Sequence, residues 1–199
     1  MDRYEREKTG PLNWYNKAAD LRAAAGVLWA SFDEKRSAKS VDELGLGQGF
    51  SIRVGTVDVY LMLFGMALEL LYKAILVAKD NQTEVPPTHD LAELAKLADV
   101  QVDASERNLL KILSESIIWD GRYPIPVPKQ RQQMDVLHKS RNAYLREKHS
   151  GNLKDVICLE NVLCLEGAFG WQTLNKLWDK ASEAYWKTYE SNLAEKIRQ

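Results

Sequence analysis

The stretch VDVYLMLFGMALELLYKAILVA, residues 57–78, decides the fold of this chain, and its only charged residues are Asp58, Glu69 and Lys73. A helix that is apolar on all sides needs burial on all sides, and this one is also long enough to cross a bilayer. Each charge near its middle would cost roughly 2.5–3.5 kcal/mol to insert into a membrane. Glu69 and Lys73 also stand one helical turn apart, in the order that favours pairing. The stretch therefore predicts a central helix that neighbouring helices bury, and not a membrane span.

Composition places the 199-residue chain among ordinary globular proteins, with 45% hydrophobic and 28% charged residues. This length fits one domain, or one domain with an extension, and is enough to bury a substantial core. The net charge of −1 argues against a protein that is basic throughout. The charged N-terminus lacks the apolar core of a signal peptide, so we expect a cytoplasmic protein without a membrane partner.

The two cysteines, Cys158 and Cys164, lie six residues apart in a segment with a helical pattern. On a helix this spacing separates them by about 9 Å along the axis, which is too far for a disulfide. We expect both to be small buried hydrophobic residues. No pattern in the sequence is typical of a metal site, and we expect neither a metal nor a cofactor.

The first half of the chain contains helical patterns on both sides of the central stretch. We expect a flexible N-terminal arm over residues 1–12, followed by one domain over 13–199. Apolar residues at three- and four-residue steps predict a helix over about 13–35. Residues 37–52 hold three glycines among polar residues and are expected to be a flexible connection. A phosphate-binding loop is the alternative there, but no Lys-Ser/Thr follows the glycines.

The second half of the chain is also helical in pattern. Asp90 or Thr88 can cap a short helix over Leu91–Leu97, and Asp103 or Ser105 can open another helix that ends at Asp120-Gly121. Alternating prolines then force extended backbone before a helix over about 129–148 and a long helical pattern over 153–197. No stretch alternates as a strand does. The sequence therefore predicts an all-α, up-and-down bundle of five to seven helices.

Three separate pieces of the chain resemble one family when they are taken in order. GMALELLYKAIL, then THDLAELAKLA after a proline-containing loop, then IIWDGRYPIP resemble the HEPN family of helical nucleotide-binding and ribonuclease-related domains. The match covers about residues 57–126. The ordered residues that carry it, typical of one branch of the family, are Glu69, Lys73, His89, Asp90, Leu91, Arg122, Tyr123 and Pro124.

The resemblance implies a helical bundle that is often a homodimer packed along its long helices. It also implies a nucleotidyltransferase-type partner protein and a toxin–antitoxin or defence system. Active ribonucleases of the family carry an Arg, then a polar residue, and then a His, with four to six residues between the Arg and the His. Two protomers bring these motifs together and cleave RNA without metal. In such a site, His acts as general acid or base and Arg stabilises the phosphorane charge.

Two pairs in this chain partly match that motif. Arg131 and His138 have six residues between them, Gln132 is polar as the motif prefers, and the spacing puts both side chains on one helical face. Arg141-Asn142 with His149 has the Arg-Asn pair of the family but seven intervening residues, one too many. The alternative interpretation is that these residues are solvated or structural.

His89 and Arg122 also have structural interpretations. We expect His89 to belong to a loop-to-helix cap rather than to bind a ligand, because no other His or Cys lies near it in the sequence. We expect Arg122 and Tyr123 to anchor the proline-rich loop on the bundle, with Arg122 reaching toward Glu69. The aromatic residues of the last helical pattern are expected in the core or at a dimer interface.

Charge is concentrated in the segment 129–149. Its six basic residues stand against Asp135 and Glu147, which leaves +4 there and −5 in the rest of the chain. This bias suits a phosphate-binding surface, and a solvated helical face is the alternative. The basic residues are Lys129, Arg131, Lys139, Arg141, Arg146 and Lys148.

Two functions of different classes follow from the sequence. In the first, the chain is a HEPN-like binding or regulatory module without catalysis, which dimerises and acts through a partner protein, RNA or a nucleotide. In the second, it is a metal-independent endoribonuclease that uses Arg131 and His138, or Arg141 and His149. The absence of the strict motif favours the first function, and the basic segment 129–149 keeps the second open.

Overall fold

The computed structural model describes residues 2–47, 49–79, 84–123 and 169–198, with isolated positions at 125, 132, 135, 136 and 139. The elements with both ends in these residues are seven α-helices and one π-helical segment, and no described residue lies in a strand. The predicted all-α class is therefore confirmed for this part of the chain. The elements are α1 (Arg3–Thr9), α2 (Pro11–Ala30), α3 (Glu34–Leu44), α4 (Ile52–Lys79), α5 (Leu91–Leu97), α6 (Ala104–Glu115), η1 (Ser116–Asp120) and α10 (Trp171–Arg198).

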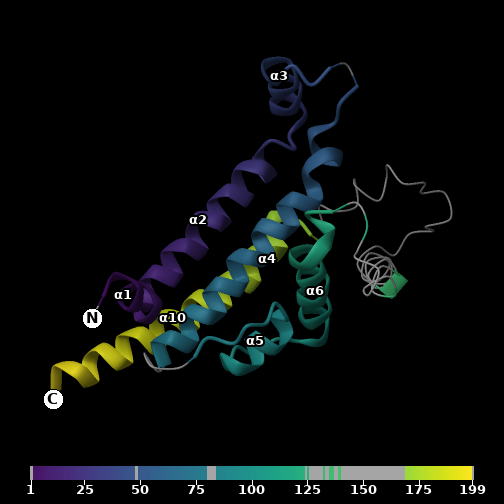
Figure 1. Ribbon diagram of the computed structural model, residues 1–199. Coiled ribbons are helices and arrows are strands. Elements are labelled where there is room, and N and C mark those ends of the chain that lie inside the picture. The colour runs from purple at the N-terminus through teal and green to yellow at the C-terminus, as the bar shows by residue number, and fades with distance from the viewer. Residues whose placement is uncertain are drawn as a thin grey trace.

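Helix α4 is the centre of the bundle. It packs against α2 and α10 and also against α5, α6 and η1 (Figure 1). This contact on several sides suits its sequence, because Phe64, Leu68, Leu71 and Ile75 are fully buried. The helix is long and apolar enough to cross a membrane, but 78% of its most apolar 18-residue stretch is buried inside the protein. The prediction that neighbouring helices bury it is confirmed.

The long helices alternate in direction only in part. Helix α2 runs antiparallel to α4, and α6 runs back along α4 on another side (Figure 1). Helix α10 runs in the same direction as α4, as two hydrogen bonds show. The Tyr60 hydroxyl donates to the Phe169 carbonyl near the N-terminal ends of both helices, and Asn192 donates to the Ala78 carbonyl near their C-terminal ends. The up-and-down order therefore holds for α2, α4 and α6, and α10 departs from it (Figure 1).

Aromatic residues join α2 to α10. The Arg22 guanidinium lies 5.3 Å from the ring centre of Trp171 and 5.0 Å from that of Trp178. It also donates two hydrogen bonds to Asn175 Oδ1, at 2.8 and 2.6 Å. Further along, the Tyr15 ring stacks on Tyr185 with centres 4.6 Å apart. The expectation that the aromatics of the last helix belong to the core is confirmed for Trp178 and Tyr185, which are buried.

The N-terminal region differs from the sequence prediction. Residues 3–9 form α1 where a loose arm was expected, because the Asp2 side chain accepts from the Glu5 amide and caps the helix. The single helix expected over 13–35 is two helices, since Asp33 caps a new one by accepting from the Arg36 amide. Residues 37–44 are therefore helical and not a loose connection. Gly45, at φ +63°, ends α3 in the left-handed region.

The elements after α4 follow the prediction closely. Asp90 caps α5, and Asp103 caps α6 with a capping box to Glu106. Helix α6 continues as the π-helical segment η1 and ends at Gly121 as predicted. At φ −80°, however, Gly121 does not need the left-handed conformation that a glycine cap suggests. It allows close packing, because a Cβ at this position would overlap Met62 Cβ of α4.

Candidate functional site

A cluster of ionisable side chains centres on the buried Glu69 of α4. Lys73 Nζ donates to Glu69 Oε1 at 2.6 Å, and His89 Nδ1 lies 2.9 Å from Glu69 Oε2. Glu69 and Lys73 are buried, with 6% and 7% of their surface exposed, whereas the His89 side chain is 55% exposed. The predicted pairing of Glu69 with Lys73 is confirmed. His89 is a second partner that the sequence analysis did not anticipate.

The loop before α5 brings His89 to Glu69. His89 directly precedes Asp90, whose carboxylate accepts from the amides of Ala92 and Glu93 and so fixes the start of α5. Thr88 Oγ1 in turn accepts from the Asp90 amide. His89 therefore lies at the start of α5, as expected, while its ring reaches back to α4. We name Glu69, Lys73 and His89 the ion cluster.

Arg122 does not join the ion cluster, and the expected contact between Arg122 and Glu69 is wrong. Its guanidinium donates to the Ile118 carbonyl, one turn earlier, and lies 5.6 Å from the ring centre of Tyr123. The physical reason is local: the chain turns at Gly121, and the nearest acceptor for Arg122 is a carbonyl at the end of η1. Tyr123 is exposed. Pro124 lies outside the described residues.

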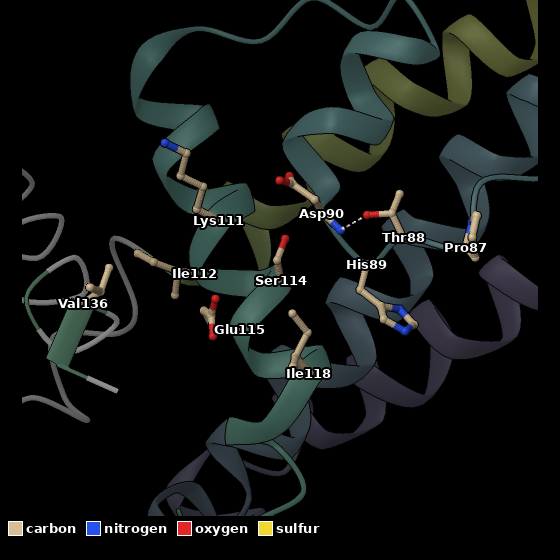
Figure 2. A pocket seen from close by; sticks show the side chains of 10 residues that line it. All are labelled: Pro87, Thr88, His89, Asp90, Lys111, Ile112, Ser114, Glu115, Ile118 and Val136. Carbon is tan, nitrogen blue, oxygen red and sulfur yellow. Dashed lines mark hydrogen bonds between the residues drawn. The ribbon is translucent and has the colours of Figure 1, made fainter. Parts of the chain in front are cut away.

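A cavity of about 500 Å³ opens beside the ion cluster, between the loop that carries His89 and residues of α6 and η1. Figure 2 shows Pro87, Thr88 and His89 on one side, Val136 on the opposite side, and residues of α6 and η1 between them. The volume lies within the range of small-molecule sites. The lining residues are Pro87, Thr88, His89, Asp90, Lys111, Ile112, Ser114, Glu115, Ile118 and Val136.

Two polar side chains from α6 have different roles in this cavity. The Ser114 hydroxyl donates to the Leu110 carbonyl and accepts from the Leu91 amide, so it ties α6 to the start of α5. Glu115 accepts a hydrogen bond from Trp119 Nε1 at Oε2, at 2.9 Å. Burial raises the pKa of the Glu115 carboxyl, Asp120 raises it further, and the bond from Trp119 opposes both.

Sequence reasoning missed Glu115, although the sequence contained a signal for it. Ser114, Glu115 and Ser116 interrupt the apolar run of α6, and Glu115 stands one turn before Trp119. Polar residues within an apolar helical segment are either satisfied within the fold or face a cavity. Both serines are buried and donate to carbonyls four residues earlier, whereas the carboxyl group of Glu115 faces the cavity.

Most of the predicted catalytic and nucleic-acid-binding residues lie outside the described residues. These are Lys129, Arg131, His138, Arg141, Asn142, Arg146, Lys148 and His149. Of that predicted set, Lys139 is described, and it is exposed. The part of the chain that the structure describes holds no group of three or more His, Cys, Asp or Glu residues arranged to bind a metal.

Comparison of the chain with protein-family models, with curated proteins and with solved structures gave no match.

Proposed function

We propose that the chain is a HEPN-like helical binding or regulatory module that works as a homodimer in an RNA- or nucleotide-linked system of the toxin–antitoxin or defence type. The observation that carries this proposal is the ion cluster. Glu69, Lys73 and His89 belong to the ordered set on which the family resemblance rests. Although His89 follows Glu69 by 20 residues, all three side chains meet at one carboxylate.

The geometry of the ion cluster favours a structural role for these three residues within a binding module. Each oxygen of Glu69 already has a partner within the chain, and Lys73 is buried with it. A general acid or base must reach a substrate, which the buried Glu69 and Lys73 do not. The ion cluster instead holds the loop of His89 against α4, and function then depends on the surfaces that this frame positions.

The homodimer has a candidate surface on α10. Trp186, Leu193 and Ile197 are exposed and recur at seven and four residues, which puts them on one face of the helix. Such a face suits helix packing against a second copy. Light scattering after size exclusion should give a dimer mass at micromolar concentration. Changing Leu193 and Ile197 to Lys should give a monomer, and Val27→Lys, at an exposed position of α2, should not.

RNA binding tests the functional part of the proposal. The +4 segment should bind single-stranded RNA with about four phosphate contacts, so log affinity should fall with log salt at a slope near −3. Neutralising Arg131, Lys139, Arg141 and Arg146 should abolish binding. A matched control changes four exposed lysines elsewhere to Gln and should bind as the unmodified chain does; these are Lys8, Lys35, Lys39 and Lys96. Equal RNA affinity in the two quadruple variants would refute the RNA-linked role.

The same assay decides between the regulatory module and the ribonuclease. Intact RNA after prolonged incubation selects the regulatory module. Cleavage that persists in EDTA and is lost in His138→Ala or His149→Ala selects the ribonuclease, whose support is the basic segment with its two Arg–His pairs. Either variant should keep RNA affinity close to that of the unmodified chain, because the phosphate contacts remain.

A further inference from the structure

The carboxyl group of Glu115 faces the cavity with unused hydrogen-bonding capacity. Trp119 Nε1 bonds Oε2, and among the described residues no second partner bonds Oε1. No cationic side chain of the described residues forms an ion pair with Glu115. Lys111 precedes Glu115 by one turn, but its side chain extends away from the carboxyl (Figure 2).

The charges and surfaces around Glu115 define what the cavity would accept. Among the described residues of the lining, two carboxylates, those of Asp90 and Glu115, stand against one ammonium group, that of Lys111. The remaining described lining residues are of two kinds: four are aliphatic, namely Pro87, Ile112, Ile118 and Val136, and three are polar, namely Thr88, His89 and Ser114. A partly buried carboxylate without a cation is unfavourable, and an incoming cation would offset that cost through a charge-assisted hydrogen bond.

We propose that this cavity binds a small organic cation, with an ammonium or amidinium group on Glu115 and an apolar body against Ile112 and Ile118. This inference does not depend on the proposed RNA-linked function, because it uses neither the basic side chains of the segment 129–149 nor the α10 surface. It gives Glu115 the role of a specificity-determining residue. The raised pKa of Glu115 is consistent with it, since a bound cation restores the favourable surroundings that burial removes.

Benzamidine is the probe, because it joins an amidinium group to a flat apolar ring, and neutral benzamide is its matched control. We expect benzamidine to bind the unmodified chain with a Kd of roughly 1 mM, as suits a ligand of this size. Benzamide should bind about ten-fold more weakly or not at all, because it lacks the charge. Methyl signals of Ile112 and Ile118 in NMR should shift during the benzamidine titration, and this locates the ligand.

A pair of variants tests the role of Glu115. Glu115→Gln keeps an oxygen acceptor for Trp119 and should lower benzamidine affinity to that of benzamide. Glu93→Gln removes an exposed carboxylate of α5 that does not line the cavity, and should change affinity by less than about two-fold. The pKa of Glu115, followed by NMR, should also fall when benzamidine is added.

Three results would overturn the proposal. The first is no shift of the Ile112 and Ile118 methyls at about 10 mM benzamidine, which would mean that the cavity is closed to cations in solution. The second is equal affinity for benzamide and benzamidine, which would leave an apolar hollow without charge recognition. The third is equal loss in Glu115→Gln and Glu93→Gln. None of these results bears on dimerisation or RNA binding, so the two proposals fail separately.

Discussion

Removing one member of the ion cluster should destabilise the bundle more than removing two. Glu69→Leu leaves Lys73 buried, and among the described residues no other acid forms an ion pair with it. Breaking a buried pair in this way typically costs about 3–5 kcal/mol. In contrast, the double variant Glu69→Leu/Lys73→Leu places two apolar side chains in an apolar helix. It should lie within about 1 kcal/mol of the unmodified chain, or be more stable.

The position of His89 makes the two single variants unequal. After Lys73→Leu, Glu69 still has His89 at Oε2, so the remaining acid keeps one partner, and we expect a loss of about 1–3 kcal/mol. His89→Ala should cost less, about 0.5–1 kcal/mol, because water already competes for the hydrogen bond of this half-exposed ring. The expected order of destabilisation is therefore Glu69→Leu, then Lys73→Leu, then His89→Ala.

Urea unfolding of the four variants measures these differences. Circular dichroism should give a urea midpoint for each variant. The dependence of the free energy of unfolding on urea concentration should be unchanged, so the midpoints can be converted to free energies of unfolding. The double-mutant cycle for Glu69 and Lys73 should give a coupling of about 3 kcal/mol or more. If Glu69→Leu and Lys73→Leu simply add in the double variant, the pair is not coupled and our account of α4 is wrong. Leu70→Ala, at a partly buried position of α4, is the control for an ordinary packing loss.

Three further stability predictions concern single sites. Glu115→Gln should be more stable than the unmodified chain near neutral pH. The pKa of Glu115 is raised in the folded chain, so the stability of the unmodified chain falls as the pH rises through that pKa. The urea midpoints of the two proteins should therefore converge toward about pH 4. Arg22→Met should lower the free energy of unfolding by about 1–3 kcal/mol, because it removes two contacts with aromatic rings and the hydrogen bonds to Asn175. Arg107→Met, at an exposed position, should change it little. Gly121→Ala should lower the free energy of unfolding by about 1–3 kcal/mol, because the new methyl group would overlap Met62 and α4 would have to move. An unchanged melting temperature would contradict the close packing at Gly121.

The central part of the fold could be predicted because its signals are local. An apolar stretch, a capping Asp before α5 and a capping box at α6 each act within a few residues. The pairing of Glu69 with Lys73 is likewise set by one turn of helix. Local rules also explain the errors near the N-terminus, where Asp2 and Asp33 cap helices that the apolar pattern alone does not indicate.

The contacts between distant segments could not be predicted from the same signals. The bond of His89 to Glu69 depends on the path of the chain between α4 and α5, which no periodicity specifies. The expected contact of Arg122 with Glu69 is not formed, because the Arg122 side chain bonds a carbonyl of η1 instead. The cavity at Glu115 arises only when α6 packs beside the loop of His89. It is a property of tertiary packing, which sequence spacing does not encode.

The ion cluster and the cavity share one piece of chain, the loop that precedes α5. His89 fixes this loop to α4, and the Leu91 amide fixes it to Ser114 of α6. One rim of the cavity is therefore held from two sides before any ligand arrives, so a ligand would lose little free energy in ordering it. Residues that support the fold, such as Glu69 and Ser114, therefore also set the geometry of the cavity. The Glu69 carboxylate acts on the cavity through His89, without contact to what the cavity binds.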